Sequence, residues 1–273
     1  MGGFCCIIIY MKEFDYLGEG EVYLDAACQS LRPRCVIDAL NQYYTEHNSC
    51  GERVKYKWGV ETDEKVEETR ELVLKYLGLK SKKYTVSFTL NTTYGINLIL
   101  SQLRAGCFNK VMTSEIEHNS PFLATMAFSE RTQLPREVMK REDDGSIPLP
   151  NYDFTRAVVV VNCASNFDGR KLLNIKELVK TVHKAGGIVI IDAAQAMAHS
   201  SDILQGVEPD AICFSAHKLY APSLGVIVWR DELDAKMTVG FVGGGMVDDV
   251  EKDSYDLSAE GKEHRYTRFE SGL

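Results

Sequence analysis

The sequence predicts an α/β fold in which a mostly parallel sheet carries helices on both faces. From Tyr84 onward, short runs rich in Val and Ile alternate with segments of helical periodicity, which is the pattern of βαβ units. Two of the runs contain a continuous stretch of Val and Ile, so both faces of those strands should be covered. The chain has 273 residues, 45% hydrophobic and 26% charged, enough for a globular protein with a full core.

The elements are read from the residue pattern. Strands are expected at residues 84–90, 110–114, 156–163, 187–192, 210–215 and 224–229, with a weaker one at 137–140. Crossover helices are expected at 93–103 and 175–185, and two further helices at 33–47 and 63–77. We therefore divide the chain into a tail (1–20), an N-terminal helical arm (21–80), a ligand-binding α/β domain (81–240) and a Gly-rich loop with a C-terminal segment without periodicity (241–273).

Charge and cysteine content exclude several classes of function. A net charge of -8 disfavours nucleic acid as a partner, because phosphate binding needs an excess of clustered Lys and Arg. The apolar stretch at 4–11 is too short to span a bilayer, so no membrane partner is expected. The eight cysteines form no C-x-x-C pair and no zinc-type spacing, which predicts free thiols in the cytoplasm and no metal site.

Polar residues follow several predicted strands, where open α/β sheets bind their ligands. Asp192 ends one strand and Lys218 follows the next, so a carboxylate and an amine should face one crevice. A partly buried lysine there can condense with an aldehyde, and the carboxylate would pair with a cation. The ordinary alternatives are a solvated loop lysine and a helix N-cap.

Three further positions fit such a site. Thr92 and Thr93 open the helix after the first strand, where free N–H groups can bind phosphate, although a plain Thr N-cap is the commoner reading. His118 could stack on a flat ligand or simply be solvated. Asn166 could donate to a ring oxygen or make an Asx turn.

Taken together, these segments resemble the class V aminotransferase family of pyridoxal-phosphate (PLP) enzymes, in particular its cysteine desulfurase branch. The resemblance covers about 22–272. Its segments are YLDAA at 23–27, NTTYGIN at 91–97, EHN at 117–119, SN at 165–166, DAAQ at 192–195 and FSAHKLY at 214–220. It implies the large domain of a fold type I PLP enzyme.

The resemblance also implies a role for each matched residue. Lys218 would carry the cofactor as a Schiff base and act in catalysis, with His118 stacked on the ring. Cofactor-binding residues would be Thr92, Thr93, His118, Asn166, Asp192, Gln195, Ser215, His217 and Lys218. Asp192 would pair with the pyridinium nitrogen, Gln195 with the phenolic oxygen, and Thr92 or Thr93 with Ser215 and His217 would hold the phosphate.

The implied reaction is removal of sulfur from L-cysteine by a homodimer that passes the sulfur to an acceptor protein. Selenocysteine lyase or another class V activity is the alternative. Family members usually continue into a small C-terminal domain that supplies a substrate-binding arginine and a nucleophilic cysteine, which are not matched here, so a catalytically silent or split PLP-binding chain is also considered. A nucleotide-binding Rossmann domain is disfavoured, because no G-x-G-x-x-G follows a strand.

Overall fold

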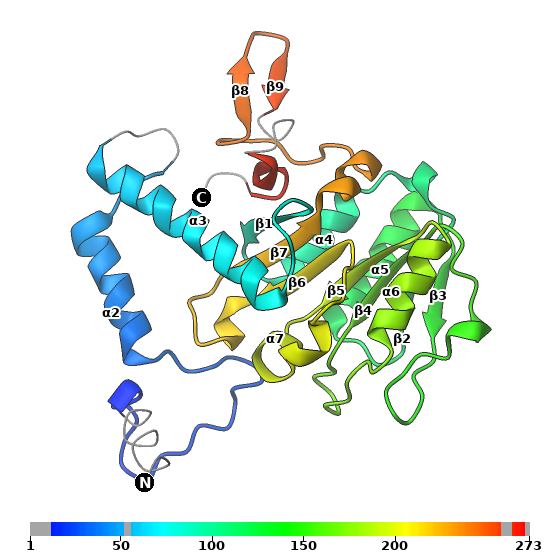
Figure 1. The fold of residues 1–273 in the computed structure, drawn as a ribbon, viewed down its shortest axis with the longest axis horizontal. Helices are drawn as coiled ribbons and strands as arrows, with labels where there is room; N and C mark the ends of the chain where they lie inside the picture. The colour runs from blue at the N-terminus through cyan, green and yellow to red at the C-terminus, as the bar shows by residue number, and fades with distance from the viewer. Residues whose placement is uncertain (1–11, 52–55, 258–263, 271–273) are drawn as a thin grey trace.

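A seven-stranded sheet forms the centre of the computed structural model, which describes residues 12–51, 56–257 and 264–270 (Figure 1). Its strands are β1 (Tyr84–Thr89), β2 (Lys110–Ser114), β3 (Arg136–Met139), β4 (Ala157–Asn162), β5 (Ile188–Asp192), β6 (Ala211–Ser215) and β7 (Gly225–Arg230). They lie in the order β1-β7-β6-β5-β4-β2-β3, and only β7 runs antiparallel to its neighbours. The predicted mostly parallel sheet is confirmed, and each predicted strand is found within one residue at both ends.

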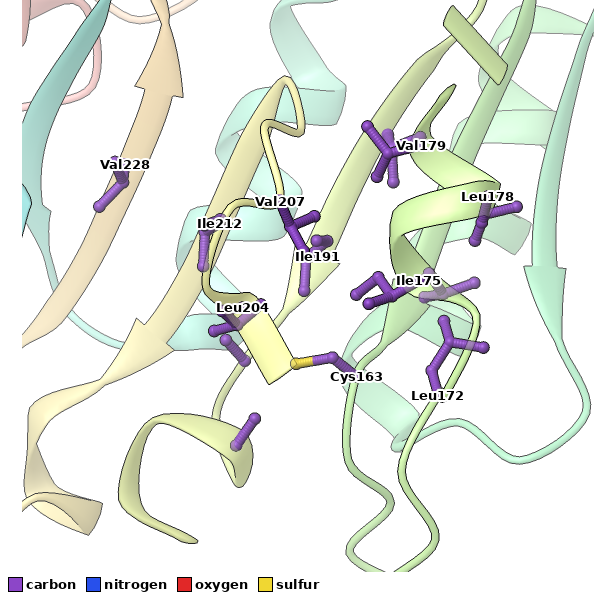
Figure 2. Packing of buried hydrophobic residues seen from close by; sticks show 14 of the residues in the cluster. Cys163, Leu172, Ile175, Leu178, Val179, Ile191, Leu204, Val207, Ile212 and Val228 are labelled. Atoms are coloured by element: carbon purple, nitrogen blue, oxygen red, sulfur yellow. The ribbon is translucent and has the colours of Figure 1, made fainter. Parts of the chain in front are cut away.

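Helices cover both faces of the sheet, as predicted (Figure 1). On one face lie α3 (Lys57–Leu77), α6 (Ile175–Lys184) and α7 (Ala196–His199); on the other lie α4 (Thr92–Gln102) and α5 (Asn119–Thr132). Alternation along β4 explains the two cores, because Val159 and Val161 pack on the first face and Val158 and Val160 on the second. Figure 2 shows the first core, with Leu178 and Val179 of α6 near side chains of the sheet.

The strand directions bring the carboxyl ends of several strands to one edge of the sheet. Because β7 lies antiparallel between β1 and β6, β1 runs in the same direction as β4, β5 and β6. The carboxyl ends of these four strands therefore meet at one edge. Asn162 of β4 and Asp192 of β5 are direct neighbours there, and Asp192 pairs in turn with Cys213 of β6.

Several predicted boundaries are corrected. The helix predicted at 33–47 is an α-helix, α2 (Arg34–Gln42), followed by a π-helical segment η1 (Tyr43–His47), and Pro33 is its N-cap. The helix predicted at 63–77 begins at Lys57, because its solvated first turns carry little apolar periodicity, and ends at Gly78 in the left-handed conformation (φ 68) as expected.

Helix α5, a C-terminal hairpin and several short helices were not predicted. The sequence of helix α5 lacks a clear helical periodicity, because apolar residues lie on both its sides: Phe128 is buried, whereas Leu123 is 55% exposed. The segment 241–273, predicted as loop, contains a hairpin of β8 (Val247–Val250) and β9 (Tyr255–Leu257). The short helices are η2 (Ala105–Cys107), η3 (Leu149–Asn151), η4 (Ser201–Leu204), η5 (Ala216–Lys218), η6 (Asp231–Lys236) and η8 (Arg265–Arg268).

Part of the predicted tail, residues 1–11, and the last three residues of the chain lie outside the described residues. Across the described ranges, none of the helices combines the length and apolar character needed to cross a membrane.

Candidate active site

A cavity of about 510 Å³ opens at the carboxyl ends of β1, β4, β5 and β6, a size that suits a small-molecule ligand. All nine residues predicted for the site line it, namely Thr92, Thr93, His118, Asn166, Asp192, Gln195, Ser215, His217 and Lys218. They come from five separate segments of the chain. The strand order brings them together, since each segment lies at or just after the carboxyl end of β1, β2, β4, β5 or β6, and these five strands end at the same edge of the sheet.

Asp192 and Lys218 face the same cavity and influence each other. Burial raises the pKa of the Asp192 carboxyl group, and the N–H of Ala194, 2.9 Å from Oδ1, together with the charges of His118 and Lys218, opposes the shift. Burial lowers the pKa of the Lys218 amine, and Asp192 opposes this. The site thus holds a carboxylate that needs a cation and an amine that loses its proton more readily than an ordinary lysine.

Several hydroxyl groups cluster at the junction between β1 and α4. The N-cap of α4 is Asn91, which accepts from Tyr94 N at 2.9 Å, so the expected Thr N-cap is wrong. The Thr92 and Ser215 hydroxyls are 2.6 Å apart, and Ser215 Oγ also accepts from Thr92 N at 2.9 Å. Gly225 makes this possible, because a Cβ there would lie 2.4 Å from the Asn91 nitrogen.

His118 is held in one orientation. It is the N-cap of α5, and its Nδ1 accepts from Ser120 N at 3.0 Å, with the Ser120 hydroxyl 2.8 Å away. An acceptor Nδ1 leaves the proton of the neutral ring on Nε2. Ser120 also lies 2.6 Å from the Thr93 hydroxyl, so the histidine and the start of α4 are joined. His118 is exposed, but its Nδ1 is engaged by the first turn of α5.

The N-terminal segment forms a wall of the cavity, which sequence reasoning missed. Asp25, Ala27 and Cys28 line the cavity, and Gln195 Nε2 donates to Ala27 O at 2.9 Å. Ser30 ties the segment to η5, because its backbone N and its hydroxyl donate to His217 O at 3.0 and 2.8 Å. The matched segment at 23–27 was the available signal, but nothing in its composition revealed a role.

Cys28 is the described cysteine that lines the cavity, whereas Cys35 and Cys50 are exposed elsewhere. Asn91, Ser120, Asn162, Ala164 and Ala194 also line the cavity and were not predicted. Burial and then the charge of Lys218 lower the pKa of His217. Within the described ranges, no three His, Cys, Asp or Glu side chains gather as metal ligands.

Comparison with known proteins decides the family. The family model for class V aminotransferases matches residues 22–272 of this chain. The chain belongs to the class V aminotransferase family. The predicted resemblance is thereby confirmed, and the pyridoxal-phosphate dependence of this family agrees with the predicted cofactor.

Class V relatives of this chain include cysteine desulfurases. A probable cysteine desulfurase of Vibrio cholerae is 30% identical over 249 residues, which are 88% of this chain and 60% of that protein. A cysteine desulfurase of Enterobacter sp. (strain 638) is 29% identical over 82% of this chain and 57% of that protein. A solved cysteine desulfurase of Thermococcus onnurineus NA1 has TM-score 0.80 and 28% identity over 92% of this chain and 63% of that one. The chain spans about 60% of the length of these curated relatives.

The cavity of this class V chain fits the family's cofactor. A lysine with a lowered pKa suits an aldehyde, a buried carboxyl group suits a protonated ring nitrogen, and clustered hydroxyls at a helix start suit a phosphate. Asn162, 3% exposed, also offers a buried Oδ1 without a hydrogen-bond partner among the described residues. These groups therefore match the aldehyde, the ring nitrogen and the phosphate of pyridoxal phosphate.

Proposed function

We propose that this chain binds pyridoxal phosphate and acts on an amino acid as a cysteine desulfurase-like enzyme, removing sulfur from L-cysteine. One observation carries the proposal: all nine residues predicted from the sequence line a single cavity, in which Asp192 and Lys218 shift each other's pKa. The cysteine desulfurases among its relatives support the choice of substrate.

Three residues would do the central work. Lys218 would hold the cofactor through its amine, which burial makes available in the unprotonated form. Asp192 would keep the ring nitrogen protonated, and His118, oriented by Ser120, would lie against the ring. When bound, pyridoxal phosphate supplies an electron sink for the pair left when a substrate bond breaks. Lys218, once released by the substrate amine, would carry protons as the general acid and base.

The remaining residues would fix the position of the cofactor. Thr92 and Thr93, with Ser215 and His217, would hold the phosphate at the start of α4. Gln195 has a second amide hydrogen beyond the one donated to Ala27 O, and this hydrogen would reach the phenolic oxygen. Asn166 would sit near the substrate carboxylate. Each of these groups would exclude water from one side of the ring.

The cofactor is tested by reduction. Protein incubated with pyridoxal phosphate, treated with borohydride and digested should carry the cofactor's mass on the Lys218 peptide. Lys218→Ala should lose both this adduct and the visible absorption band, because the variant removes the only lysine among the described residues that line the cavity. Lys180→Ala, on the outer surface of α6, should keep both. An adduct that persists in Lys218→Ala would refute the assignment.

The reaction is tested separately. Protein loaded with cofactor should convert L-cysteine to alanine, and with excess dithiothreitol present, which supplies the two electrons that reduce the removed sulfur, the sulfur should be released as sulfide. Release of selenide from selenocysteine with no sulfide from cysteine would favour the lyase alternative. A loaded protein that turns over neither amino acid would favour a cofactor-binding chain that is silent or that works with a separate C-terminal partner.

The cavity rim supports a homodimer with sites at the subunit boundary. Large apolar side chains stand exposed next to cavity-lining residues: Leu24, 87% exposed, precedes Asp25, and Phe167, 89% exposed, follows Asn166. Exposed apolar groups that flank a site are typical of an interface. Analytical ultracentrifugation should give twice the chain mass, and Leu24→Asp should shift the equilibrium to monomer.

Location and partners complete the proposal. A cytoplasmic location agrees with the free thiols of Cys28, Cys35, Cys50, Cys107, Cys163 and Cys213. Sulfur release also implies a sulfur-acceptor protein, whose addition should raise the turnover rate.

A further inference from the structure

The loop that carries His118 is fastened to β4 by hydrogen bonds in both directions. The Glu117 carboxyl group accepts from Asn162 N at 2.7 Å and bonds the Ser114 hydroxyl at the end of β2. In return, the Asn162 side-chain amide donates to the Ile116 carbonyl. Glu117 thus bridges two parallel strands immediately before the residue proposed to contact the ring.

Through Asn162, the same hydrogen-bond bridge also reaches the strand position next to Asp192. Asn162 is the register partner of Asp192 and lines the cavity with it. A displacement of Asn162 N would therefore move a wall of the cavity and the strand end beside Asp192. Two parts of the proposed machinery, His118 and the neighbour of Asp192, depend on one carboxyl group.

The chemistry of the bridge favours a neutral acid. Burial raises the pKa of Glu117 to about 8, with the Ser114 bond, Arg141 and the Asn162 N–H opposing it and Asp192 adding to it. In the structure Asn162 N donates to Oε2 and the Ser114 hydroxyl donates to Oε1. In the neutral acid the proton would sit on Oε1, because Asn162 N–H can only donate, and the Ser114 hydroxyl would turn to accept it. A glutamine side chain has the same arrangement, with its oxygen toward Asn162 and its NH2 group toward Ser114.

We propose that Glu117 is a positioning residue of this site, whose carboxyl group, bonded to Ser114 and Asn162, fixes both the direction of His118 and the place of Asn162 beside Asp192. The part of this role that concerns the cofactor ring rests on the proposed function. The part that concerns the loop does not, because the hydrogen bonds exist in the chain itself.

The test compares three variants at Glu117 with one control. Glu117→Gln keeps both hydrogen bonds and should bind pyridoxal phosphate within about twofold of the unmodified chain. Glu117→Ala removes both and should weaken binding by about tenfold and reduce the visible circular dichroism of the bound cofactor. Glu117→Asp is one methylene too short to reach both partners and should fall between them, and it stands in if the alanine variant does not fold. Glu130→Ala, an exposed acid on α5, is the control.

A second readout needs no cofactor. Amide hydrogen exchange at residues 115–118 and at Asn162 should be faster in Glu117→Ala and Glu117→Asp than in the unmodified chain, and unchanged in Glu117→Gln. If the unmodified chain binds no pyridoxal phosphate, the proposed function fails and exchange still decides the role of Glu117. If the alanine or aspartate variant matches the unmodified chain in both exchange and affinity, the positioning role is overturned.

Discussion

Two pairs of opposite charge among the described residues are built in contrasting ways. Arg70 and Glu270 are buried and join α3 to the segment after η8, whereas the buried Asp192 and the partly buried Lys218 line the cavity and act on each other through their charges. The first pair meets its hydrogen-bonding needs within the protein. The second pair keeps hydrogen-bonding and charge-pairing groups available for a ligand.

Arg70 is surrounded by partners. Its guanidinium group donates to both Glu270 carboxylate oxygens at 2.6 and 2.9 Å, and to the Val86 carbonyl at 2.6 Å. The ring of Tyr266 lies 4.0 Å from its central carbon. Burial alone would lower the pKa of Arg70, but the bonds and charge of Glu270 outweigh it and raise the pKa. Each charge is more stable because the other is present.

The pair in the cavity shows the opposite balance. Burial prevails at both residues, so the pKa of Asp192 is raised and that of Lys218 is lowered. Each charged form is therefore less stable than in water. A buried charge that has all its hydrogen-bond partners therefore stabilises the fold. A buried charge that lacks some of them has a perturbed pKa, which favours reactivity.

The largest expected effect is the loss of stability when the Arg70–Glu270 pair is broken. Glu270→Ala leaves the Arg70 charge buried without its main partner and should lower the free energy of unfolding by about 3–5 kcal/mol. Glu67→Ala removes another acid that contacts Arg70, at 2.9 Å, but this acid is 61% exposed and the loss should be below about 1 kcal/mol. Urea unfolding measures both. Equal losses would show that burial of the partner is not what distinguishes the pairs.

This first pair also marks the limit of prediction from sequence. Alternation of residue type predicted the strands and the polar residues at their ends, because a strand buried on both faces has few ways to be polar except where it stops. Nothing local in Arg70 or Glu270 reveals that they meet, since 200 positions separate them. Cys28 and Asn162 were missed for the same reason: each reaches the cavity through tertiary structure rather than through a motif.

The second prediction concerns Asp192, where removal of a charge should have the opposite effect on stability. The pKa of Asp192 is raised in the folded chain above 3.8, so its contribution to stability is present in acid and is lost as pH rises through the folded value. Asp192→Asn keeps an acceptor for Ala194 N and carries no charge. The variant should therefore equal or exceed the unmodified chain in unfolding free energy at pH 7, with the advantage shrinking toward pH 4.

The same variant should lose function. An asparagine cannot balance a protonated ring nitrogen, so pyridoxal phosphate should bind at least about tenfold more weakly to Asp192→Asn. Thermal unfolding at several pH values and cofactor titration measure the two effects on one protein. A variant that is less stable at pH 7 would contradict the contrast between the two pairs.

The smallest expected effect is protection of Cys28 from alkylation, which tests whether the cofactor occupies this cavity. Cys28 lines the cavity beside Lys218, whereas Cys35 and Cys50 are exposed outside it. Alkylation of Cys28 should therefore slow by about fivefold when pyridoxal phosphate is bound at a hundredfold excess over its dissociation constant, because the ligand then fills the cavity in nearly every molecule. Alkylation of Cys35 should be unchanged, which mass spectrometry of the digested protein measures in the same sample. Protection of both thiols would point to a general closure of the chain instead of occupancy of this cavity, and protection of neither would place the cofactor elsewhere.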